Sequence, residues 1–239
     1  MYTTNRANAW WRKDLSLRYG LNREKAGEIS THEPYGRYLH MIAAGFPDEG
    51  VKFWDLPEAQ ATIKPNHGYD PELAKQLFEK AMANNGYGPN DKLTLNMIYA
   101  ETSSLWKLFA EFVQAEYAAL FGEDRFEITL TAMPYAQAMD LIKTWKTNPN
   151  AYELAWAGWI HGGSLFNPCI QFMFFSEDYF NLNSPPPNDK VTKLYAESLT
   201  EEARLNQERL VELAIEMEKA MVDDVYVVPV GWRAAAASV

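Results

Sequence analysis

The fold of this 239-residue chain is decided by residues 70–99, which read DPELAKQLFEKAMANNGYGPNDKLTLNMIY. Asp70 can cap a helix, Pro71 suits the first helical turn, and apolar residues then recur at helical spacing before Gly86. From Leu93 onward, apolar side chains recur at every second position, which is the period of a β-strand. The segment therefore predicts a helix followed by a strand.

The alternation of helices and strands continues to residue 159. A helix is predicted at about 105–113, a strand at 126–131, a short helix at 138–142 and a strand at 152–159. The last of these is apolar on both faces, as expected of a central strand. Strands that alternate with helices imply parallel crossover connections, so we expect an α/β fold.

The flanking segments are less regular. Upstream, we expect a helix from about Trp10 to Ile29 and a long irregular segment at 31–68, rich in proline and glycine. Downstream, two helices are predicted, at about Asp189–Ser198 and Glu201–Val222, with Ser198 and Glu201 as a capping box. A closing strand is predicted at 225–230, and one α/β unit is expected to cover most of the chain.

Composition excludes several classes of protein. The chain has 22 Lys+Arg against 32 Asp+Glu, a net charge of −10, which argues against nucleic-acid binding. A hydrophobic fraction of 47% is too high for disorder. No apolar run approaches the roughly 20 residues needed to cross a bilayer, so membrane insertion is not expected. The single cysteine, Cys169, excludes an internal disulfide and a multi-cysteine metal site.

Signatures of catalysis are absent from the sequence. There is no Walker-type loop, no G-x-S-x-G elbow and no H-E-x-x-H motif. The four histidines lack a spacing that would place two of them on one metal ion, so neither a metal nor a cofactor is expected. A pairing of Cys169 with His161 stays open, as does a hydrolase that uses paired carboxylates as general acid and base. We do not expect an enzyme.

The most informative segment is 155–168, which reads AWAGWIHGGSLFNP and follows the predicted central strand. In open α/β sheets, ligands bind at the carboxyl ends of the strands. Gly158 and Gly162 would let a ligand approach the main chain, while Trp159 and Phe166 offer flat apolar walls. The alternative is that Trp156 and Trp159 are core residues and that the glycines only turn the chain.

Several segments resemble, in the same order along the chain, motifs of the family 5 solute-binding proteins of peptide-type ABC importers. These segments are 1–5 (MYTTN), 17–25 (LRYGLNREK), 69–77 (YDPELAKQL), 153–159 (ELAWAGW) and 220–230 (AMVDDVYVVPV). The resemblance implies a type II periplasmic-binding-protein-like lobe, an α/β structure with a mixed sheet and helices on both faces. It also implies that residues 1–239 form a single carboxyl-terminal lobe, and that the amino-terminal lobe is not in this sequence.

The function implied by the resemblance is binding without catalysis. Such a protein encloses a peptide or a related small solute between two hinged lobes and delivers it to an ABC permease. The implied location is extracytoplasmic, in the periplasm or, as a lipoprotein, at the outer face of the cell membrane. An oligosaccharide-binding member of the family and a lobe reused as a docking module are the alternatives.

Site residues are carried over singly from the resemblance. Trp159 matches a family tryptophan that lines the cleft, Gly158 matches the glycine before it, and Tyr135 falls near an aromatic residue at the start of the preceding helix. The position of His161, two residues after Trp159, favours contact with the ligand, and the alternative is an exposed histidine in a turn. Peptide-binding members carry an aspartate three residues after the tryptophan, where it pairs with the ligand's amino terminus, and here that residue is Gly162.

The departure at Gly162 affects the expected ligand. Enclosing an ammonium group without a counter-ion costs several kcal/mol. We therefore expect either a peptide held mainly by backbone contacts or an oligosaccharide that stacks on Trp156 and Trp159.

Overall fold

The structure is a computed structural model of the chain. It describes residues 2–4, 17–22, 25, 57, 61, 68–144, 147–156, 189–224 and 227–228. The irregular segment predicted at 31–68 lies almost wholly outside these residues. The chain divides into two compact units, which are described separately. The sheet unit comprises Met1–Leu39, Pro65–Ala157 and Val228–Val239, and the helical unit comprises His40–Lys64 and Gly158–Val227.

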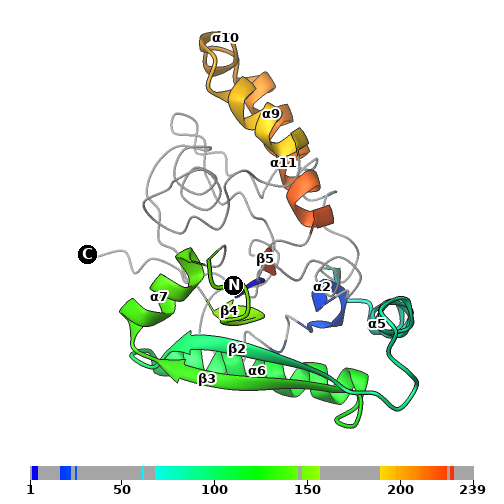
Figure 1. The fold of residues 1–239 in the computed structure, drawn as a ribbon. Helices are drawn as coiled ribbons and strands as arrows, with labels where there is room; N and C mark the ends of the chain where they lie inside the picture. Colours follow the sequence, from blue (N-terminus) through cyan, green and yellow to red (C-terminus); the bar gives the residue numbers. More distant parts are fainter. Residues whose placement is uncertain are drawn as a thin grey trace. The chain divides into compact units, whose positions relative to one another are not determined.

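A mixed β-sheet organises the sheet unit (Figure 1). Its strands are β1 (Tyr2–Thr4), β2 (Leu93–Ala100), β3 (Phe126–Met133), β4 (Leu154–Trp156) and β5 (Val227–Val228), in the order β3-β2-β4-β1-β5. The boundary between the units falls within β5, so that only Val228 of this strand belongs to the sheet unit. Strand β2 pairs in parallel with β3 and β4, whereas β1 is antiparallel to β4. All three residues of β4 are buried, as predicted for a central strand.

The direction of the connections places helices on both faces of the sheet. The chain passes from β2 through α6 (Ser104–Phe121) to β3, and then back past β2 through α7 (Tyr135–Lys143) to β4. Because crossover connections are right-handed, two crossovers in opposite directions lie on opposite faces. The expected α/β architecture, with a mixed sheet and helices on both faces, is confirmed.

Aromatic side chains fill the face of the sheet that α6 covers. The ring of Phe126 on β3 lies 5.3 Å from that of Phe121 and 6.1 Å from that of Tyr117, both on α6. Phe78 stacks on Phe121, with ring centroids 4.5 Å apart. Fully burying each such side chain contributes about 1.5–3 kcal/mol, so these four rings anchor the unit.

Local signals explain where the helices of the sheet unit begin. Helix α5 (Pro71–Asn84) starts as predicted, because the Asp70 carboxylate accepts the Leu73 amide at 2.9 Å. The predicted helix at Trp10–Ile29 is wrong as a continuous element. Helix α2 (Leu17–Gly20) stops before Leu21 and Asn22, which have no regular structure. A Cβ at Gly20 would lie 2.7 Å from Leu120 Cδ2, so glycine allows α2 to approach α6 closely.

A side chain extends the pairing between β2 and the residue before β4. The Asn96 amide donates to Glu153 Oε2 at 2.7 Å, while the Glu153 amide donates to the Asn96 carbonyl at 3.1 Å. The Asn96 side chain in turn accepts a hydrogen bond from the Thr131 hydroxyl of β3 at 2.7 Å. Glu153 thus supplies an acceptor where the short strand β4 offers no carbonyl.

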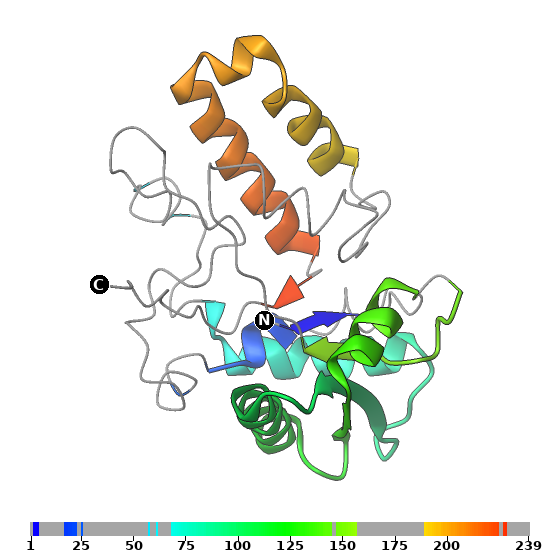
Figure 2. The same cartoon turned by 90° about the vertical axis from the view of Figure 1, so that its left-hand side faces the viewer.

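The helical unit consists of α9 (Asp189–Ser198), α10 (Glu201–Arg204) and α11 (Gln207–Asp224), with α9 and α11 side by side (Figure 2). The predicted continuous helix at Glu201–Val222 is wrong, because it breaks at Leu205 and Asn206. The predicted capping box is also wrong. Thr200 caps α10, whereas the buried Ser198 hydroxyl donates to the Tyr195 carbonyl at 2.6 Å.

Candidate functional site

Only two of the seven predicted site residues are described by the structure. Tyr135 and Trp156 are described. Gly158, Trp159, His161, Gly162 and Phe166 lie outside the described residues, so their roles stay predictions. Cys169, and with it the open pairing with His161, also lies outside. The site can therefore be built only from the strand ends that lead into this segment.

The carboxyl ends of β2, β3 and β4 meet at one edge of the sheet, because these strands run parallel. A backbone hydrogen bond of 2.9 Å, from the Glu101 amide to the Met133 carbonyl, joins the ends of β2 and β3. Helices α6 and α7 both begin at this edge, and β4 ends there at Trp156. We call it the carboxyl edge; it is the usual place for ligands in open α/β sheets.

Trp156 is a core residue of the sheet unit. It is 4% exposed, and its indole stacks on the Phe109 ring of α6, with centroids 5.3 Å apart and an interplanar angle of 8°. Leu154 pairs with Met97, so Trp156, two residues on, points to the same face as Met97, towards α6. One face of the indole is occupied, which disfavours the predicted stacking of a sugar on Trp156.

Tyr135 lies at the carboxyl edge, at the first residue of α7, as the resemblance implies for an aromatic at a helix start. Its side chain is 47% exposed. Pro134 precedes it as the cap residue and provides no side-chain cap. The Tyr135 ring contacts the indole of Trp106, with ring centroids 6.0 Å apart and an angle of 45° between the rings.

Sequence reasoning missed Trp106. It lies in the first turn of α6 and is half-buried, and its amide donates to the Ser103 hydroxyl at 3.3 Å. The missed signal is topological: Trp106 and Tyr135 each follow closely on the end of a strand, and parallel pairing brings those two ends together. The carboxyl edge therefore carries an aromatic pair from two helices, in which Tyr135 is exposed and Trp106 is half-buried.

The charges around the aromatic pair come from few groups. Glu101 is exposed and has no ion-pair partner among the described residues. Lys107, the nearest cation in sequence, pairs with Glu111 at 3.6 Å. Neither α6 nor α7 has an acidic residue in its first turn, so both helix N-termini keep their partial positive charge.

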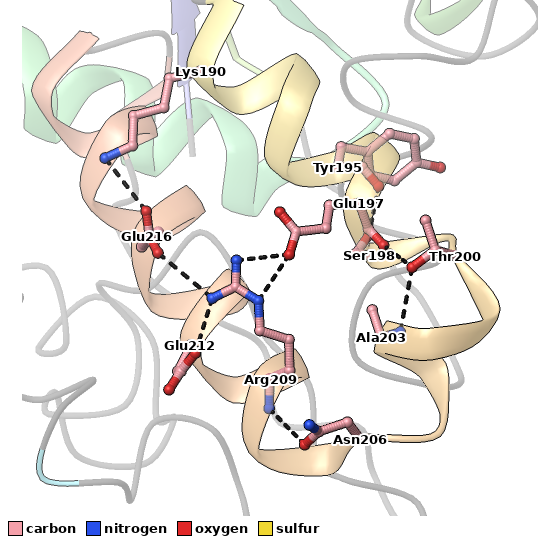
Figure 3. Close-up of polar contacts among 10 residues, drawn as sticks. All are labelled: Lys190, Tyr195, Glu197, Ser198, Thr200, Ala203, Asn206, Arg209, Glu212 and Glu216. Carbon is pink, nitrogen blue, oxygen red and sulfur yellow. Dashed lines mark hydrogen bonds and ion pairs between the residues drawn. The ribbon is translucent and has the colours of Figure 1, made fainter.

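The helical unit contains an ion-pair network around Arg209 (Figure 3). The guanidinium lies 2.7 Å from Glu197 of α9, 2.8 Å from Glu212 and 3.9 Å from Glu216 of α11. Lys190 of α9 lies 3.6 Å from Glu216. Hydrogen bonds to Glu212 and Glu197 raise the pKa of Arg209. Since every carboxylate here is paired, the network joins two helices and leaves no group for catalysis.

Catalytic and metal chemistry find no support in the part of the chain that the structure describes. Within it, no group of His, Cys, Asp or Glu side chains could hold a metal ion. Glu201 and Glu202 lie exposed in the first turn of α10, where they offset the helix dipole. No described helix is both long and apolar enough to cross a membrane.

Comparisons with known proteins agree on the fold. No protein-family model matches the sequence, and no curated protein matches it. Among solved structures, a peptide-binding protein of a peptide ABC transporter is 21% identical, with a TM-score of 0.70 and 96% of each chain covered. A periplasmic murein tripeptide-binding protein, MppA, in its unliganded open form is 18% identical with a TM-score of 0.67. OppA of Haemophilus influenzae, in complex with the peptide RPPGFSPFR, is 18% identical with a TM-score of 0.63.

The lengths of these neighbours differ. This chain covers 96% of the first neighbour, but only 40% of MppA and 41% of OppA, although 96% of this chain is matched in both cases. It therefore corresponds to part of the two longer proteins. At these identities the likeness shows the fold. The chain has the fold of substrate-binding proteins of the periplasmic-binding-protein type, which confirms the predicted structural resemblance.

Proposed function

We propose that this chain is the solute-binding part of an ABC importer, in which it binds a peptide or a related small solute. The observation that carries the proposal is the match of at least 96% of the chain to peptide-binding proteins, one of them in complex with a peptide. The carboxyl edge supports it, because the predicted binding segment at 155–168 begins in β4, whose carboxyl end lies at that edge.

The proposed mechanism is enclosure without chemistry. A solute would be held at the carboxyl edge and covered by a second lobe, which the two longer neighbours have room to supply. The neighbours are binding proteins and not enzymes, which fits the absence of catalytic motifs from the sequence. We further propose an ABC permease as partner and an extracytoplasmic location, the location printed for MppA.

Peptides are the first class of ligand to test. The chain is titrated by calorimetry with short peptides and with the nine-residue peptide of the H. influenzae complex. We expect saturable binding and a raised melting temperature, because a ligand at 100 times its dissociation constant stabilises the folded state by about 2.7 kcal/mol. Oligosaccharides serve as the comparison class.

Two results would contradict the proposal. Turnover of peptides or glycosides by the purified chain would favour a hydrolase. Absence of saturable binding by every peptide, together with tight binding of a protein partner, would favour a docking module.

A further inference from the structure

The aromatic pair at the carboxyl edge is not used by the core of the sheet unit. The core rings of Phe78, Tyr117, Phe121 and Phe126 contact one another, whereas Trp106 and Tyr135 contact no other described ring. Tyr135 is 47% exposed and Trp106 is half-buried. A single exposed aromatic side chain is common on protein surfaces. An exposed ring and a half-buried ring, brought together from two helix starts at a sheet edge, form an aromatic surface that a ligand can contact.

Glu101 lies at the same strand ends from which the two aromatic residues follow. Its amide is bonded to Met133, two residues before Tyr135, and it lies five residues before Trp106. Its carboxylate is exposed and has no ion-pair partner among the described residues, whereas Lys107 is paired with Glu111.

The charges at the carboxyl edge differ in how they are distributed. The two helix N-termini together carry roughly one positive charge, which is spread over backbone amides and falls off within the first turn, whereas the Glu101 carboxylate concentrates its charge on two oxygens that can pair directly with a cation. The Ser103 hydroxyl already accepts one amide of α6. The net charge of −10 over the whole chain also attracts cations over a longer range.

We propose that Trp106, Tyr135 and Glu101 form a subsite for a cationic group of the bound solute, either a primary ammonium or a guanidinium. The cation would lie against the ring faces, whose quadrupole attracts positive charge, and would pair with the Glu101 carboxylate. The inference rests on the proposed function and specifies its ligand class. In this subsite Glu101, which follows β2, is the counter-ion. It would replace the aspartate that the resemblance places at the position of Gly162.

The test uses three peptide probes and calorimetric titration of the full chain. Acetyl-Ala-Lys-Ala carries a cationic side chain, Ala-Leu-Ala carries a free amine, and acetyl-Ala-Leu-Ala carries neither. We expect at least one cationic probe to bind about 5- to 20-fold more tightly than acetyl-Ala-Leu-Ala. Which cationic probe is preferred decides between a side chain and an amino terminus as the source of the charge.

Three variants separate the contributions of the three residues, and two further variants serve as controls. Glu101→Gln should abolish the preference for the cationic probe, and Trp106→Leu and Tyr135→Ala should each weaken its binding roughly 2- to 5-fold. Trp106→Phe keeps an aromatic ring and should therefore retain most of the affinity for the cationic probe that Trp106→Leu loses. Leu108→Ala is the matched control: Leu108 is 48% exposed on the same helix but lies about 200° around the helix axis from Trp106. Circular dichroism checks that each variant is folded.

The outcomes distinguish the two proposals. If peptides bind but acetyl-Ala-Leu-Ala binds as tightly as the cationic probes, the subsite is refuted and the proposed function stands. The subsite is equally refuted if the preference persists unchanged in Glu101→Gln and in both ring variants. If no peptide binds at all, the proposed function fails and the subsite fails with it.

Discussion

The two units are stabilised by different forces. In the sheet unit, four buried rings pack between α5, α6 and β3, and their contacts are apolar. In the helical unit, apolar residues of α9 and α11 are buried, but a guanidinium with three carboxylates also joins the two helices at the surface. Screening by salt weakens the ion pairs of the second arrangement, whereas the apolar contacts of the first have no charges to screen. The stability of the helical unit should therefore depend on ionic strength, and that of the sheet unit on the packing of its buried rings.

The largest effect is expected from the aromatic core of the sheet unit. Phe126→Ala removes a ring that contacts Phe78, Tyr117 and Phe121, and it leaves a cavity in a buried position. We expect a loss of about 3–5 kcal/mol in the free energy of unfolding of this unit, at low and high salt alike. Denaturant titration followed by near-ultraviolet circular dichroism measures it. Phe112→Ala, at a half-buried position of α6, is the control and should cost less.

A smaller effect in the same unit is expected from Glu153. Glu153→Ala leaves the Asn96 amide without its acceptor at a partly buried position. The expected loss is about 1–3 kcal/mol, and Glu153→Gln should recover much of it, because the amide oxygen can accept the same hydrogen bond. Glu127→Ala, on the neighbouring strand, removes only an exposed ion pair with Lys92 and should cost less than about 1 kcal/mol. Equal losses in Glu153→Ala and Glu127→Ala would contradict this role.

The helical unit should respond to salt. Arg209→Met removes the shared partner of three carboxylates and should lower the thermal stability of α9 and α11 at low salt. The loss should be smaller than that caused by Phe126→Ala or by Glu153→Ala. At about 1 M salt the difference from the unmodified chain should vanish, since the Debye length is then about 3 Å. Lys107→Met in the sheet unit breaks a single exposed pair and should have no measurable effect at any salt concentration. A salt-independent loss in Arg209→Met would indicate lost packing instead.

The smallest effect concerns pH. Burial raises the pKa of Tyr195, and the nearby Arg204 opposes this shift. Because the raised pKa belongs to the folded state, the stabilisation is complete below the unfolded value of about 10 and is lost as the pH rises above it. Absorbance titration of tyrosinate should therefore include a late-ionising component that is missing in Tyr195→Phe. An unchanged titration curve in that variant would overturn the assignment.

The regular part of the sheet unit could be predicted from local sequence. Asp70 and Pro71 mark a helix start through a backbone requirement, and the alternation in β2 follows from the geometry of a strand. The two incorrect helices share a cause. The apolar spacing continues through Leu21 and through Leu205, and such spacing does not predict where a helix ends. At the second break, the Asn206 side chain accepts the Arg209 amide of α11, while Thr200 caps the short helix α10 that precedes the break.

The candidate site could be predicted only in part. Tyr135 was found at a helix start because the resemblance marks that position. The role of Trp156 depends on Phe109, which lies 47 residues earlier, and such a contact leaves no periodic trace in the sequence. Trp106 was missed for the converse reason: its ring lies at an edge that exists only after β2 and β3 have paired.

The hydrogen bond between the Glu101 amide and the Met133 carbonyl has a consequence for recognition. It joins the ends of β2 and β3, which lead into the helices that contain Trp106 and Tyr135. The spacing between the two helix starts is therefore fixed without a ligand. A preorganised surface of this kind loses little conformational freedom on association. At the proposed subsite, discrimination among solutes should then arise mainly from the rate at which each solute dissociates, and much less from its rate of association.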